Sequence, residues 1–183
     1  GESFVRVSRV PILERSDLEP LTLNTAPCVL REDGVWRMWY VSGVNWVNRD
    51  LPRYNIKYAE SDDGLHWRTP NLGLIPFQGS TDNNLVAPLL ERQSLQGATV
   101  FRDDGAPTAE RYKLWTKFLP TVEEREAGAR AGLWGMRSPD GLHWSYYAGQ
   151  PNPEGACDTQ NMVFWDDRLL CYVGYTRVRA TQQ

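Results

Sequence analysis

Apolar and polar positions alternate along the chain in short runs that are separated by acidic turns. A typical unit begins with an apolar run, passes through an acidic turn with an Asp-Gly pair or two aspartates, and returns in an aromatic run. Asp-Gly between two such runs is a strong signal for a β-hairpin. Three hairpins are predicted in this way, pairing residues 27–30 with 36–41, 98–101 with 112–117, and 162–165 with 170–175.

The hairpins belong to a repeated unit. Residues 61–67 read SDDGLHW and residues 138–144 read SPDGLHW, which is six identical positions of seven at an offset of 77. The upstream segments WRMWYVSG at 36–43 and YKLWTKFL at 112–119 are offset by 76, so the similarity extends beyond a chance heptapeptide. A third unit starts at residues 162–176 and the chain ends before another DGLHW.

Each full unit has room for four antiparallel strands. A third strand at 54–61 is matched by 132–138, and the turns Asp63-Gly64 and Asp140-Gly141 lead into short outer strands at Trp67 and Trp144. Repeated four-stranded units are typical of β-propeller blades. We therefore expect an all-β fold, a partial β-propeller over residues 1–183 with blade units near 20–70, 95–147 and 158–183.

About two and a half blades do not close a ring, because propellers usually have roughly four to eight. The sequence thus predicts part of a larger propeller, or closure against another chain. An open blade face would expose apolar surface, and we expect self-association through it. Residues 120–131 lack strand patterning and are predicted to form a solvated insertion or one short helical turn.

The amino-acid composition is consistent with the predicted all-β fold. Eight Trp, eight Tyr and five Phe suit strands packed in stacked sheets, although indole rings also suit a sugar-binding surface. The net charge of −3 and the scattered basic residues argue against a nucleic-acid partner, and no apolar run approaches the ~20 residues that span a bilayer. The three cysteines are widely spaced, and neither their spacing nor any motif indicates a metal site or a cofactor.

Several sequence segments resemble those of bacterial glycosidase-related five-bladed propellers, the proteins grouped near glycoside hydrolase families 32, 43, 68 and 130. The similarity covers most of residues 20–178, and the phrases that carry it are VLREDGVWRMWYVSG, IKYAESDDGLHW, TPNLGL, STDNNLV, SPDGLHW and DTQNMVFWDDR. The resemblance implies a central funnel that faces the first, inner strand of each blade. It also implies a carbohydrate ligand and carboxylates at the starts of the first three inner strands, acting as nucleophile or base, as orienting group and as general acid.

Matched position by position, the chain departs from that pattern. Thr25 falls near the first expected carboxylate, Gln96 near the second and Asp158 near the third, so only one position holds an acid. Glycoside hydrolysis needs two carboxyl groups across one bond. Glu19, just before the first inner strand, and Asp82, in the long connection after the first blade, are the carboxylates that could substitute.

The candidate catalytic residues are therefore Asp158, Glu19 and Asp82, each with an ordinary structural alternative. Asp158 could cap the turn before its strand, Asp82 could form an Asx turn, and Glu19 could pair with Arg15 on the surface. Trp46 lies in a loop outside the repeat and is the candidate for stacking on a sugar ring. The full set of expected substrate-binding residues is Asn24, Thr25, Trp46, Gln96, Gln160 and Asn161.

Asp63 and Asp140 are predicted to be architectural, because two equivalent turns cannot both face one funnel centre with different tasks. Two functions stay open. One is a glycoside hydrolase or related glycosyl-transferring enzyme, which the polar run DTQN at 158–161 and the resemblance favour. The other is a non-catalytic propeller that binds glycan or protein, which the missing carboxylates favour. A sialidase-type propeller fits less well, since its repeated box is one residue longer.

Overall fold

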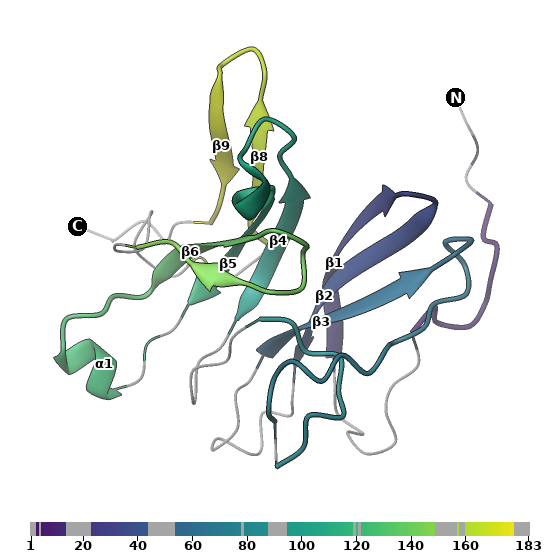
Figure 1. The fold of residues 1–183 in the computed structure, drawn as a ribbon, viewed down its shortest axis with the longest axis horizontal. Helices are drawn as coiled ribbons and strands as arrows, with labels where there is room; N and C mark the ends of the chain where they lie inside the picture. Colours follow the sequence, from purple (N-terminus) through teal and green to yellow (C-terminus); the bar gives the residue numbers. More distant parts are fainter. Residues whose placement is uncertain are drawn as a thin grey trace.

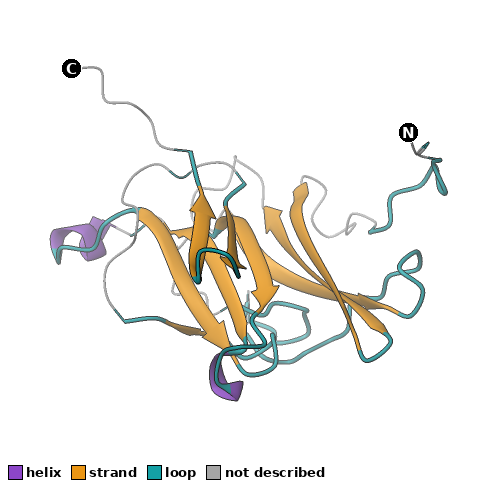
Figure 2. Cartoon of the chain, turned by 90° about the horizontal axis from the view of Figure 1, so that it is seen from above, coloured by secondary structure: helices purple, strands orange, loops and turns teal. Residues whose placement is uncertain are grey.

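The computed structural model describes residues 3, 5–13, 23–43, 54–77, 79–87, 95–118, 120, 122–148, 157 and 160–177. This part of the chain is all-β, as expected, with one short helix α1 (Val122–Glu126) and a 3-10 turn at Thr108–Glu110 (Figure 2). The helix lies in the segment for which the sequence predicts a short helical turn.

The strands form three antiparallel sheets that follow one another along the chain (Figure 1). Inner strands β1, β4 and β8 are neighbours in space, since β1 contacts β4 and β4 contacts β8. Successive sheets joined through their first strands are the arrangement of propeller blades. The first sheet is β1 (Leu23–Glu32), β2 (Val35–Gly43) and β3 (Tyr54–Ser61); the second is β4 (Gln96–Arg102), β5 (Tyr112–Phe118), β6 (Gly132–Ser138) and β7 (Ser145–Tyr146); the third is β8 (Met162–Asp166) and β9 (Cys171–Tyr175).

The hairpin turns follow the sequence pattern closely. Asp33 and Gly34 both have positive φ, 49° and 87°, as a two-residue turn between twisted strands requires. The third hairpin differs from the prediction: Leu170 was expected in a strand but lies in the turn with φ 52°, and β9 begins one residue later. The turn is longer because Asp166 accepts hydrogen bonds from the backbone N–H groups of Arg168 and Leu169.

The outer edge of the first blade also differs from the prediction. The expected strand at Trp67 is reduced to an isolated bridge between Glu60 and Arg68. The connection that follows runs back along β3, with the bridge Lys57–Leu85 and a hydrogen bond from the Leu95 N–H to the Tyr54 carbonyl. In the second blade the outer strand expected at Trp144 is present one residue later as β7, which pairs with β6.

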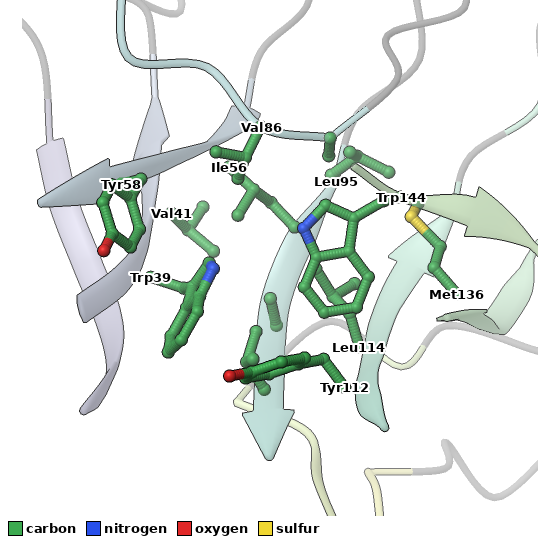
Figure 3. Packing of buried hydrophobic residues seen from close by; sticks show 13 residues of the cluster. Trp39, Val41, Ile56, Tyr58, Val86, Leu95, Tyr112, Leu114, Met136 and Trp144 are labelled. Atoms are coloured by element: carbon green, nitrogen blue, oxygen red, sulfur yellow. The ribbon is translucent and has the colours of Figure 1, made fainter. Parts of the chain in front are cut away.

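Buried side chains fill the spaces between the sheets. The main cluster lies between the first and second blades and includes Trp39, Tyr58, Tyr112, Leu114 and Trp144 (Figure 3). A smaller cluster of Leu133, Cys157 and Val163 lies between the second and third blades. Met38, Tyr40 and Ala59 are buried on the opposite face of the first blade, so its strands carry large residues on both faces, as the sequence predicts.

The third sheet leaves apolar surface exposed. The paired residues Met162 and Tyr175 are 52% and 63% exposed. The prediction of an open apolar blade face is thus confirmed for the described residues, whereas self-association through it stays a prediction.

Candidate functional site

The starts of inner strands β1 and β4 carry matching irregularities. The pairing of β1 with β2 shifts between Thr25 and Cys28, and the pairing of β4 with β5 shifts between Gln96 and Thr99. One residue in each bulge has positive φ, Ala26 at 52° and Gly97 at 60°. Bulges bend a strand and re-aim its side chains, and they are over-represented next to functional sites.

Contacts across the inner strands join their starts. The Cys28 thiol donates to the Ala98 carbonyl at 3.7 Å and accepts the Val100 N–H at 3.2 Å. Burial raises the pKa of Cys28, so the thiol stays protonated and links β1 to β4. From the other side, the Asn161 N–H donates to the Gly97 carbonyl at 3.1 Å. The Gln160 side-chain amide donates to the Ala98 carbonyl at 2.8 Å.

The side chains that remain accessible here are neutral and polar. Asn24, Thr25 and Gln160 are exposed, and Gln96 is half-buried. Amide and hydroxyl groups can both donate and accept, as the hydroxyls of a sugar do. The structure therefore brings these predicted binding residues to one region, at the starts of neighbouring inner strands.

Asn161 has a different position from the one expected. Its side chain is fully buried. Its amide nitrogen donates to the carbonyls of Gly97 at 3.0 Å and Cys157 at 3.2 Å, and its oxygen accepts the Thr176 hydroxyl at 2.6 Å. This burial leaves no face of Asn161 for a ligand, so its role in this structure is to join the second and third sheets.

Asp82 lies away from the inner strands. Its carboxylate accepts a hydrogen bond from the Asn71 amide, and its own N–H donates to the Ser80 hydroxyl at 2.9 Å. The adjoining Asn84 pairs with Tyr58 on the outer edge of β3, so β2 and β3 separate this segment from β1. The segment that holds Asp82 is therefore attached to the edge of the first sheet opposite β1.

Three candidates lie outside the described residues, namely Glu19, Trp46 and Asp158. Their placement stays a prediction. Asp158 precedes Gln160 by two residues, and Glu19 precedes the first residue of β1 by four.

The repeated aspartates are architectural, as predicted. Asp63 Oδ1 accepts the N–H groups of Leu65 and His66 at 2.8 Å, and Asp140 Oδ1 accepts those of Leu142 and His143 at 2.8 and 2.9 Å. The hydrogen bond with the His66 side chain, together with these backbone bonds, holds the pKa of Asp63 well below its ordinary value. Partial burial would raise the pKa of Asp140, but the hydrogen bonds from His143, Leu142 and Ser138 outweigh it and bring it to about 2.

Sequence reasoning missed a half-buried ion pair of the first blade that faces the second blade. The Arg37 guanidinium donates to Glu32 at 3.0 Å and to the hydroxyls of Tyr58 and Tyr112, each at 3.0 Å. Burial alone would raise the pKa of Glu32, but hydrogen bonds from Tyr112, Arg37 and Arg102 hold it below its usual range. The available signal was a cation in the middle of an aromatic strand, Arg37 in WRMWY matched by Lys113 in YKLWT.

Two further findings concern the described residues alone. They contain no group of three or more His, Cys, Asp or Glu side chains that could hold a metal ion. No helix among them is long and apolar enough to cross a membrane.

Comparisons with known proteins identify relatives without an assigned activity. No family model matches the chain. Two uncharacterized proteins, from two strains of Mycobacterium tuberculosis, are each 27% identical to it over 173 residues, covering 94% of this chain and 48% of their own length. The chain thus spans about half the length of the curated relatives it matches.

Solved structures with some similarity include carbohydrate-active proteins. An N-acetylgalactosamine deacetylase from F. plautii is 17% identical, with 76% of this chain and 35% of that one covered and a TM-score of 0.43. A family 117 glycoside hydrolase from Zobellia galactanivorans is 12% identical, with coverages of 84% and 47% and a TM-score of 0.42. A GH43 β-1,3-galactosidase is 12% identical, with coverages of 68% and 33% and a TM-score of 0.39.

Proposed function

We propose that the starts of the inner strands form a carbohydrate-binding funnel and that the protein acts on a glycan there. The observation that supports the proposal is that Asn24, Thr25 and Gln160 are exposed polar residues at or next to the starts of inner strands, two of which are bulged. Exposed amides and hydroxyls fixed on a bent scaffold suit the donors and acceptors of a sugar. The motifs that resemble glycosidase-related propellers support the same ligand class.

In its catalytic form the protein is a glycoside hydrolase or a related glycosyl-transferring enzyme. Asp158, two residues before the anchored Gln160, is the proposed general acid. The second carboxyl group must lie roughly 5–5.5 Å away for retention or 6.5–9.5 Å away for inversion. Because Asp82 belongs to the outer edge of the first blade, Glu19 is the better proposed partner.

The second candidate is a non-catalytic propeller that binds a glycan, or a protein, through the same funnel. The observation that favours it is the chemistry of the first two strand starts, where Thr25 and Gln96 supply no carboxylate. Neutral side chains can hold a sugar but cannot serve as the acid and base of hydrolysis.

The experiment uses the full-length protein, a glycan array for binding and aryl glycosides for turnover. Asp158→Asn should lower turnover by about 10²–10⁴-fold if Asp158 is the general acid. It should weaken binding by about tenfold if Asp158 only accepts hydroxyls. Glu19→Gln should lower turnover without unfolding the protein, and Asp82→Asn is the matched control on the outer edge, with both readouts expected within twofold of the parent.

The outcomes separate the candidates. Binding without turnover that is lost in Asp158→Asn favours the non-catalytic funnel. The absence of any glycan bound or cleaved would overturn the proposal, as would an Asp82→Asn variant as impaired as Asp158→Asn.

A further inference from the structure

The two contacts between neighbouring blades use matching side chains. The first inter-blade cluster is Glu32, Arg37 and Tyr112, and the second is Asp103, Lys113 and Tyr172. In the first, the Tyr112 hydroxyl donates to Glu32 at 2.8 Å, and the Arg37 guanidinium lies 5.5 Å from the Tyr112 ring centre. In the second, the Tyr172 hydroxyl donates to Asp103, and the Lys113 ammonium lies 6.0 Å from the Tyr172 ring centre.

Each cation also bonds a tyrosine of its own blade. Arg37 donates to the Tyr58 hydroxyl at 3.0 Å, and Tyr58 stands opposite Trp39 in the sheet. In the second blade the residue that corresponds to Tyr58 is Gly135, which stands opposite Trp115. Lys113 therefore donates to another tyrosine, the Tyr147 hydroxyl, at 2.8 Å. A Cβ on Gly135 would lie only 3.0 Å from the Tyr147 ring, so the ring occupies the space that the glycine leaves.

The two clusters differ in the carboxylate that the cation pairs with, because Arg37 pairs with Glu32 of its own cluster at 3.0 Å whereas Lys113 pairs with Glu110 at 3.3 Å. They also differ in their contact with a turn. At the first, the turn 138–144 of the second blade completes the contact, because Arg37 donates to the Asp140 carbonyl at 2.8 Å and Trp39 donates to the Gly141 carbonyl at 2.7 Å. At the second, no turn among the described residues does so. The indole nitrogen of Trp115, which matches Trp39, has no hydrogen-bond partner in the described part of the chain.

A cavity marks the place where such a turn would lie. It has a volume of about 690 Å³ and is lined by residues that include Asp103, Lys113, Trp165 and Tyr172. The cavity at the first cluster is smaller, about 350 Å³, and Leu142 of the turn is part of its wall. The larger volume at the second cluster is what we expect if a turn is docked at the first cluster and none is docked at the second.

We propose that the cavity at the second inter-blade cluster is the docking site for a third turn of the type Ser-x-Asp-Gly-Leu-His-Trp, carried in cis by a longer form of this chain. The turn begins 25 residues after Trp36 in the first unit and 26 after Tyr112 in the second. The same spacing from Tyr172 puts it at position 197 or 198. The curated relatives, of which the chain covers 48%, are long enough to include it.

The chemistry of the turn explains why it fits this site. Its own Ser and Asp oxygens accept its backbone N–H groups, which leaves the Asp and Gly carbonyls directed at the neighbouring blade. A cation and an indole N–H are the complementary donors. Lys113 lines the cavity and already donates to Glu110 and Tyr147, which leaves its third N–H for a carbonyl, and Trp115 lies two residues further along β5. The glycine allows the indole to approach the backbone, since a Cβ on Gly141 would lie 2.6 Å from the Trp39 ring.

The experiment replaces residues 178–183 with a copy of residues 118–148, which puts the copied turn at the proposed position. The midpoint of thermal unfolding should rise by about 2–4 °C or more relative to the parent chain. The matched control carries the same extension with valine in place of the turn glycine, and its midpoint should stay at the parent value. Trp115→Phe should lower the midpoint more in the extended chain than in the parent, whereas Trp39→Phe should lower both equally.

If the extended chain does not fold, a second experiment tests the docking with a separate peptide. A peptide of residues 131–148 is titrated into the parent chain, and binding is followed by tryptophan fluorescence. The peptide should bind, and its Gly141→Val form should bind at least about tenfold more weakly.

The proposal is overturned if the valine and glycine extensions give equal midpoints, or if both peptides bind equally or neither binds. It is also overturned if the parent chain sediments as a dimer that Gly64→Val dissociates, because the site would then take the turn 61–67 of a second copy.

Discussion

The turns 61–67 and 138–144 have one internal structure in two different environments. Corresponding hydrogen bonds agree within about 0.1 Å, for example 2.7 Å between Asp and His side chains in both and 3.1 against 3.0 Å from the Trp nitrogen to the Gly carbonyl. Yet Leu65 is 50% exposed, whereas the matching Leu142 is half-buried and packs against the main core. Trp67 is half-buried, whereas the matching Trp144 is only 8% exposed and belongs to that core. The conformation of the turn is therefore determined by its own residues, and its burial is determined by the neighbouring blade.

The largest expected difference concerns the two tryptophans that end the turns. Trp144→Ala should lower the free energy of unfolding by about 3–5 kcal/mol, because it removes a large side chain from the core between the first two blades. Trp67 is half-buried against a smaller cluster, and Trp67→Ala should cost about 1–2 kcal/mol. Urea denaturation of both variants measures the two losses, and equal losses would contradict the difference in environment.

The two turn glycines should show a smaller difference. Both have positive φ, 79° at Gly141 and 76° at Gly64, so Ala costs about 1–2 kcal/mol at either place. The added Cβ would meet Trp39 at 2.6 Å in Gly141→Ala but would make an ordinary 3.4 Å contact with Trp36 in Gly64→Ala. Overpacking should raise the total cost of Gly141→Ala to about 2–4 kcal/mol. Denaturation curves with equal midpoints for the two variants would mean that docking adds no constraint.

The smallest effect should be a loss of stability in acid. Because the folded-state pKa of Asp140 lies at about 2, below the ordinary aspartate value, its contribution is present above about pH 4 and is lost as the pH falls toward 2. After allowance for solvent screening, the loss is about 1 kcal/mol. Asp140→Asn should be less stable than the parent at pH 7 and should depend less on pH across this range.

Urea denaturation from pH 7 to pH 2 measures this loss, with Asp63→Asn as the matched variant in the exposed turn. The pKa of Asp63 is also below its ordinary value, so the stability of Asp63→Asn should likewise depend less on pH than that of the parent. A parent and an Asp140→Asn chain with parallel pH dependence would contradict the assignment.

The strands with strong local signals were predicted well. Apolar and aromatic runs that end at an Asp-Gly turn predict β3 and β6 with the same bounds as in the structure, 54–61 and 132–138. The outer edge of the first blade was predicted poorly, because Arg68, the segment 84–86 and Leu95 pair with β3 through isolated contacts that depend on distant partners. The placement of Asp82 near the outer edge of β3 follows from the same pairing.

The sequence gives the positions of the polar residues along the inner strands but not their exposure. The polar residues at the strand starts mark where the funnel would lie, yet nothing in the sequence distinguishes exposed Gln160 from buried Asn161. That difference arises because the Asn161 amide meets the Gly97 carbonyl of the adjacent sheet. The bulge at Ala26 has no sequence signal either, because positive φ is uncommon for alanine.

Tyr147 of the second blade takes the structural place that Tyr58 has in the first blade, and this affects how the sequences of repeated units can diverge. A tyrosine at position 135 would compete with Tyr147 for the same volume, so mutations at these two positions are epistatic: each is tolerated or harmful depending on the other. An alignment of the two units scores Tyr58 against Gly135 as a mismatch, although one aromatic ring is retained in space. Further units in a longer homologue should therefore be sought by a ring at either of two alternative positions, and identity alone would underestimate their number.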